Sequence, residues 1–155
     1  MTVVTGSPVL DSSLYISELK CKRRDAALHE MIERAARSGA VRDPDLLQET
    51  LALRERAGST ALGKGVAIPN ARSLAVVDAR IVIGRSSRGI DWGSPDEIAI
   101  GLVLMVLSPS EISEQGHHAI LGRVAGAVRL QRQRQKLIEA ATFEAVALAL
   151  KDIGP

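Results

Sequence analysis

The glycine-rich segment at residues 58–64, G-S-T-A-L-G-K, has the spacing that most directly suggests phosphate chemistry. It matches the first seven positions of a P-loop, in which backbone N–H groups cradle phosphates. The eighth position should be a serine or threonine that holds magnesium, but it is Gly65. The segment also follows a helical pattern and leads to Pro69, whereas a P-loop joins a strand to a helix. We therefore expect a loop in which glycines permit a close backbone approach, and no nucleotide cofactor.

Two histidines and one arginine are further residues whose types could do chemistry. His117 and His118 precede an apolar helical pattern, and imidazole offers a nucleophilic nitrogen near neutral pH. Arg54 lies on the same predicted helix face as Leu47 and Leu51, at intervals of three and four residues. Periodicity alone leaves two interpretations of Arg54 open. Either it is held on this face for a functional role, or its stem covers the edge of the core while its charge reaches water.

The elements that must position these residues alternate between strand and helix. Strands are predicted at 13–19, 79–86 and 98–108. Helices are predicted around 27–35, from Asp43-Pro44 to Gly58, through most of the chain after 111, and at 143–151. The third strand is apolar at successive positions, which indicates burial on both faces. We expect a tail at 1–12 and one α/β (α+β) domain at 13–155, with helices on the sheet faces.

Composition agrees with one globular domain. The 155 residues are 46% apolar and 25% charged, with a net charge of only +2, so charge does not indicate a polyanion partner. Cys21 is the single cysteine, which excludes an internal disulfide and argues against a metal cluster. No signal peptide is indicated, and the apolar run at 98–107 is too short to span a membrane. We expect a cytoplasmic protein.

The stretch at 53–72, LRERAGSTALGKGVAIPNAR, resembles the signature of the fructose/mannitol-type IIA proteins of the bacterial sugar phosphotransferase system (PTS). That family, which includes a nitrogen-regulatory branch, has the pattern R-E-x-x-G-S-T-G-I-G-x-G-x-A-I-P-H. The matching positions are Arg54, Glu55, Gly58, Ser59, Thr60, Gly63, Gly65, Ala67, Ile68 and Pro69. Ala61 and Leu62 depart from it. The order of predicted elements suits the family, and the resemblance implies its fold, a central mixed sheet flanked by helices.

The resemblance also assigns expected roles to particular residues. In the family, the histidine that ends the pattern accepts a phosphoryl group from the phosphohistidine carrier protein; here that position is Asn70. Arg54 matches the arginine that helps to hold the phosphate, and His117 matches a second, supporting histidine. Gly63, Gly65 and Pro69 would shape the loop around the site. An asparagine amide can form hydrogen bonds, but its nitrogen is not a nucleophile.

We therefore expect a degenerate PTS IIA-like regulatory or binding module, a pseudoenzyme that presents Asn70, Arg54 and His117 to the phosphocarrier protein, to a regulated protein target or to an anion. One alternative is an active IIA component that transfers phosphoryl groups through another nucleophile such as His117. Another is a non-enzymatic domain for oligomerisation or nucleic-acid contact, suggested by the basic segment at 129–136. Its charges are distributed around the helix and no aromatic residue lies nearby, so nucleic acid is not the expected partner. The oligomeric state is left open.

Overall fold

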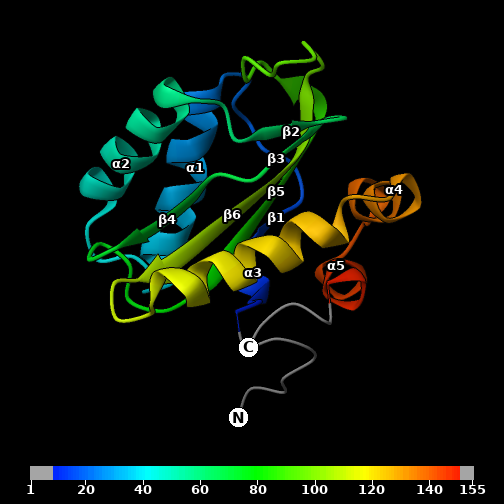
Figure 1. Ribbon diagram of the computed structural model, residues 1–155. Helices are drawn as coiled ribbons and strands as arrows, with labels where there is room; N and C mark the ends of the chain where they lie inside the picture. Colours follow the sequence, from blue (N-terminus) through cyan, green and yellow to red (C-terminus); the bar gives the residue numbers. More distant parts are fainter. Residues whose placement is uncertain (1–8, 151–155) are drawn as a thin grey trace.

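A mixed six-stranded sheet forms the centre of the protein, of which the computed structural model describes residues 9–150 (Figure 1). The strands are β1 (Tyr15–Ile16), β2 (Ala61–Gly63), β3 (Val66–Ala67), β4 (Asn70–Ser73), β5 (Arg80–Ile90) and β6 (Ile100–Pro109). Their order is β1-β5-β6-β3-β2, and β4 also pairs with β6. The β5–β6 and β2–β3 pairs are antiparallel, whereas β1 pairs with β5, and β3 and β4 with β6, in parallel. The predicted α/β domain with a mixed sheet is confirmed.

Helices cover both faces of this sheet. They are α1 (Arg24–Arg37), α2 (Pro44–Ala57), α3 (Glu114–Ala127), α4 (Gln131–Glu139) and α5 (Phe143–Ala149), with a short 3-10 helix η1 at Ser12–Leu14. Figure 1 shows α1 and α2 on one face, and α3, α4 and α5 on the other. Two hydrophobic clusters fill the two interfaces. Val103 and Met105 of β6 belong to the first and Leu102 and Leu104 to the second, so β6 is buried on both faces as its sequence predicts.

The helix signals in the sequence correspond to the caps that form. The Asp43 carboxylate accepts a hydrogen bond from the Leu46 backbone N–H at 3.1 Å, and Pro44 occupies the first turn of α2. Ser113 caps α3 in the same way through the Gly116 N–H at 3.0 Å. The cap fixes the first turn of α3, in which His117 lies.

One expectation at the start of the chain needs correction. The strand predicted at 13–19 is only the two-residue β1, because η1 occupies Ser12–Leu14 and shortens it. Within the predicted tail, Val9 is buried and its carbonyl accepts a hydrogen bond from the Ile81 N–H at 3.0 Å. The tail therefore contributes to the core from Val9 onward, and residues 1–8 lie outside the described part. No helix within residues 9–150 is long and apolar enough to cross a membrane.

Candidate functional site

The glycine loop of the sequence forms the turn between β2 and β3. Gly63, Lys64 and Gly65 all have left-handed backbones, with φ values of 87°, 60° and 83°. The Asp96 carboxylate holds the turn by accepting a hydrogen bond from the Lys64 N–H at 2.8 Å. A hydrogen bond from the Ser94 hydroxyl, together with this one from Lys64, lowers the pKa of Asp96. The glycines therefore serve a hairpin that follows helix α2, and the strand-to-helix geometry of a P-loop is absent from this segment.

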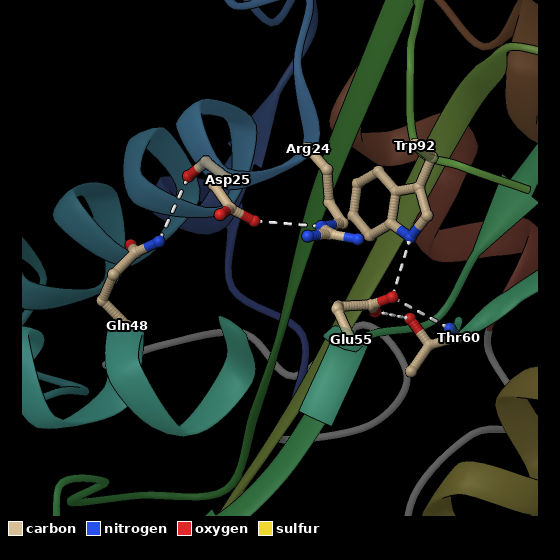
Figure 2. Close-up of polar contacts among 6 residues, drawn as sticks. All are labelled: Arg24, Asp25, Gln48, Glu55, Thr60 and Trp92. Carbon is tan, nitrogen blue, oxygen red and sulfur yellow. Dashed lines mark hydrogen bonds and ion pairs between the residues drawn. The ribbon is translucent and has the colours of Figure 1, made fainter. Parts of the chain in front are cut away.

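A buried carboxylate fixes the path of the chain from α2 into this loop. Glu55 is 4% exposed, and one of its oxygens accepts hydrogen bonds from the Thr60 backbone N–H at 3.0 Å and the Trp92 indole N–H at 3.2 Å. Its other oxygen accepts one from the Thr60 hydroxyl. Figure 2 shows Thr60 and Trp92 converging on this one carboxylate. The Glu and Thr of the R-E-x-x-G-S-T pattern thus have a structural role, because each supplies the hydrogen-bond partner that the other needs where water is excluded.

Asn70 is the first residue of β4, immediately after Pro69. The Pro69 carbonyl accepts a hydrogen bond from the Val106 N–H at 2.9 Å, so the proline extends the pairing with β6 without needing an N–H of its own. The Asn70 side chain is half-buried and makes two contacts. Its Nδ2 donates to the Ile68 carbonyl at 3.1 Å, and its Oδ1 lies 3.1 Å from Nε2 of His117.

His117 is buried between α3 and the end of β6. Its side chain is only 5% exposed, and its Nδ1 is hydrogen-bonded to the hydroxyl of Ser108 at 2.7 Å. Burial lowers the pKa of His117, and the nearby positive charges of His118 and Arg72 lower it further. The ring is therefore neutral near neutral pH, and both of its nitrogens are engaged in hydrogen bonds.

Arg54 and Arg72 differ in their surroundings. Arg54 is exposed in the last turn of α2, and its guanidinium makes no hydrogen bond or ion pair with any residue between 9 and 150. It is not joined to Asn70 or His117. Arg72 lies two residues after Asn70 in β4, and therefore on the same face of that strand. Its guanidinium donates to the carbonyls of Ser110 at 3.0 Å and Ile112 at 3.2 Å.

No group of three or more histidine, cysteine, aspartate or glutamate side chains in the described part of the chain could hold a metal ion. The groups that the structure brings together are the neutral imidazole of His117, the amide of Asn70 and the hydroxyl of Ser108, with the charge of Arg72 nearby. Such a set can bind an anion or an amide by hydrogen bonds.

Comparison with known proteins identifies the family. Residues 8–153 match the family described as phosphoenolpyruvate-dependent sugar phosphotransferase system, EIIA 2. The chain belongs to this EIIA 2 family. It is 29% identical to the fructose-specific EIIA component of Haloferax volcanii over 153 residues, which is 99% of either chain. It is 33% identical to a nitrogen regulatory protein of Bradyrhizobium diazoefficiens, over 77% of this chain and 76% of that one.

Solved structures share the fold of this EIIA 2 chain. The nitrogen regulatory protein IIA-Ntr of Neisseria meningitidis superposes with a TM-score of 0.83 at 26% identity, covering 92% of this chain and 96% of that one. Escherichia coli enzyme IIA for mannitol, solved in complex with phosphorylated enzyme IIB, shares the fold with a TM-score of 0.77 at 17% identity, over 90% and 95% of the two chains. Some relatives are much longer. The chain spans only 20% of the fructose-specific EIIABC component of Bacillus subtilis, to which it is 29% identical over 83% of its own length.

The structure of this EIIA 2 domain brings together two of the residues that the sequence singles out, Asn70 and His117. It adds Ser108 and Arg72, which sequence reasoning missed. A signal was present for each. Ser108 is the polar residue that ends an otherwise apolar buried strand, and Arg72 follows Asn70 at the two-residue period that places side chains on one face of a strand.

Proposed function

We propose that this EIIA 2 protein is a regulatory or binding module of the nitrogen-regulatory kind, which docks onto a PTS protein without taking a phosphoryl group at residue 70. The observation that carries the proposal is the side chain at position 70, an amide hydrogen-bonded to His117. The resemblance of the segment around it to the family signature supports Asn70 as the equivalent of the phosphoacceptor histidine. Phosphoryl transfer needs a nucleophile in line with the leaving group, and an amide nitrogen does not supply one.

His117 is poorly placed to take over as the phosphoacceptor. His117 is only 5% exposed, and each of its ring nitrogens is within hydrogen-bond distance of another side chain. A phosphoryl group on either nitrogen would have to displace Asn70 or Ser108. A PTS-dependent label that disappears in a His117→Ala variant would nevertheless establish the active alternative.

The contacts of the basic segment at 129–136 also favour a protein over nucleic acid as the partner. Arg134, within this segment, donates to the carbonyls of Val128 at 3.0 Å and Arg129 at 2.7 Å, so it closes the end of α3. The one tryptophan, Trp92, is buried and cannot stack on a base. The complex of mannitol IIA with phosphorylated IIB supports a docking role for the shared fold.

If the protein docks onto the phosphocarrier protein, we expect Arg54 to contribute to the affinity. Its exposed guanidinium is available to a phosphate or carboxylate of the partner. In titration calorimetry with the phosphocarrier protein of the same organism, we expect saturable binding that Arg54→Ala weakens about fivefold, equivalent to about 1 kcal/mol. Arg56→Ala is the matched control, because Arg56 is also exposed in the last turn of α2. Equal effects of both variants would remove Arg54 from the docking surface. No saturable binding, where a histidine-containing EIIA protein binds, would reject the carrier as the partner.

A further inference from the structure

We propose that Ser108 is a positioning residue that holds His117 in the tautomer with its proton on Nε2, so that the ring donates a hydrogen bond toward residue 70. This inference deepens the proposed function. Only its consequence for phosphoryl transfer rests on that function. The tautomer itself follows from the contacts of three side chains, from β4, β6 and α3.

The contacts of the Asn70 amide fix its orientation. The Ile68 carbonyl oxygen is only an acceptor, so the Asn70 atom that lies 3.1 Å from it must be the NH₂ group. The amide oxygen then faces His117, with Oδ1 and Nε2 3.1 Å apart. Because this oxygen can only accept, Nε2 must carry the proton of the ring.

The other nitrogen of the same ring, Nδ1, faces the Ser108 hydroxyl. In a neutral imidazole with its proton on Nε2, Nδ1 has a free lone pair, and the Ser108 hydroxyl 2.7 Å away can donate to it. Ser108 is 0% exposed, and Nδ1 is the only hydrogen-bond partner of its hydroxyl within residues 9–150. If the ring instead donated to Ser108, the hydroxyl proton would be buried without an acceptor.

The contacts of Asn70 and of Ser108 therefore assign the same proton position independently. Ser108 lies near the end of β6, opposite Arg72 in the parallel pairing with β4, so the sheet holds its hydroxyl in place. Burial lowers the pKa of His117, which agrees with a ring that stays neutral and keeps one proton. The resulting chain of donors runs from Ser108 through His117 to Asn70 and ends at the Ile68 carbonyl.

As a consequence, the Nε2–H of His117 donates a hydrogen bond toward the side chain at position 70. The same Nε2–H that now meets the amide oxygen of Asn70 would stabilise an oxyanion, such as a phosphoryl group carried by a histidine placed there. Ser108 would act on that chemistry only through His117, since its own hydroxyl is fully buried.

The test is nitrogen-15 NMR of the histidine rings in the folded protein. Wild type is expected to show His117 with a protonated Nε2 and an unprotonated Nδ1. In Ser108→Ala, we expect exchange of the Nε2 proton with water to become about tenfold faster, because one of the two hydrogen bonds that hold the ring is lost. Ser108→Thr, which keeps the hydroxyl, should restore slow exchange. Ser86→Ala, at another buried serine that accepts the Gly89 N–H, is the matched control and should change nothing.

A wild-type spectrum with the proton on Nδ1, or unchanged exchange in folded Ser108→Ala, would overturn the inference. The wild-type spectrum decides the tautomer even if the alanine variant does not fold. A second readout is the rate of phosphoryl uptake by an Asn70→His protein, which Ser108→Ala should slow while Ser86→Ala leaves it unchanged. If Asn70→His takes up no phosphoryl group while a histidine-containing EIIA protein is labelled, docking of the carrier fails while the tautomer of His117 stands.

Discussion

Asn70→His is expected to convert the protein from one that takes up no phosphoryl group into one that accepts a single group from the phosphocarrier protein. The substitution places an imidazole at the start of β4, next to the His117 Nε2 that now faces Asn70 at 3.1 Å. The N–P bond of the carrier's phosphohistidine would break as an N–P bond to residue 70 forms. The His117 donor would stabilise the transferred group, and so would the positive charge of Arg72, which already acts on the His117 ring.

Intact mass spectrometry with phosphoenolpyruvate, enzyme I and the carrier measures this gain directly. Asn70→Gln is the matched control, because it keeps an amide at the same position and should remain unmodified. If Asn70→His also stays unmodified while a histidine-containing EIIA protein is fully labelled, the surface that docks the carrier has been lost as well. The proposal that only the nucleophile is missing would then be rejected.

Glu55→Ala is expected to lower the free energy of unfolding by about 3 kcal/mol, because it leaves three buried donors without their acceptor. The three donors are the Thr60 N–H, the Thr60 hydroxyl and the Trp92 indole N–H. Each loses a hydrogen bond to a charged group in a region that water does not reach. The loop that leads from α2 to β2 loses its anchor in the same step.

Urea unfolding followed by circular dichroism measures the loss, with the single tryptophan as a second, local probe. Glu49→Ala is the control, since Glu49 is exposed on the same helix and its loss should cost less than about 0.5 kcal/mol. A loss below about 1 kcal/mol for Glu55→Ala would show that the Glu55 cluster does not stabilise the fold.

The fold was predictable where local signals and burial agree. Asp43 and Pro44 mark the start of α2 in the sequence and form its cap in the structure. The continuous apolar run of β6 indicates a strand covered on both faces, and helices lie on both. The strand predicted at 13–19 is mostly not one, because an Asp11 cap and the turn of η1 outweigh a weak alternating pattern.

The site was predictable only in part. The expectation that Asn70 and His117 belong together came from the family resemblance, since no local pattern links residues so far apart in sequence. Ser108 could not be assigned in advance, because its contact with His117 depends on how α3 packs against the end of β6. Nor could the sequence show that Gly63 and Gly65 serve a hairpin turn held by Asp96, a residue that reaches the loop only in the folded chain.

The most direct test of the central claim is the intact mass of the wild-type protein after incubation with phosphoenolpyruvate, enzyme I and the phosphocarrier protein. A histidine-containing EIIA protein serves as the positive control in the same mixture. We expect an unchanged mass for this protein and complete modification of the control. Addition of one phosphoryl group to the wild-type protein would contradict it, because another residue would then carry the phosphate.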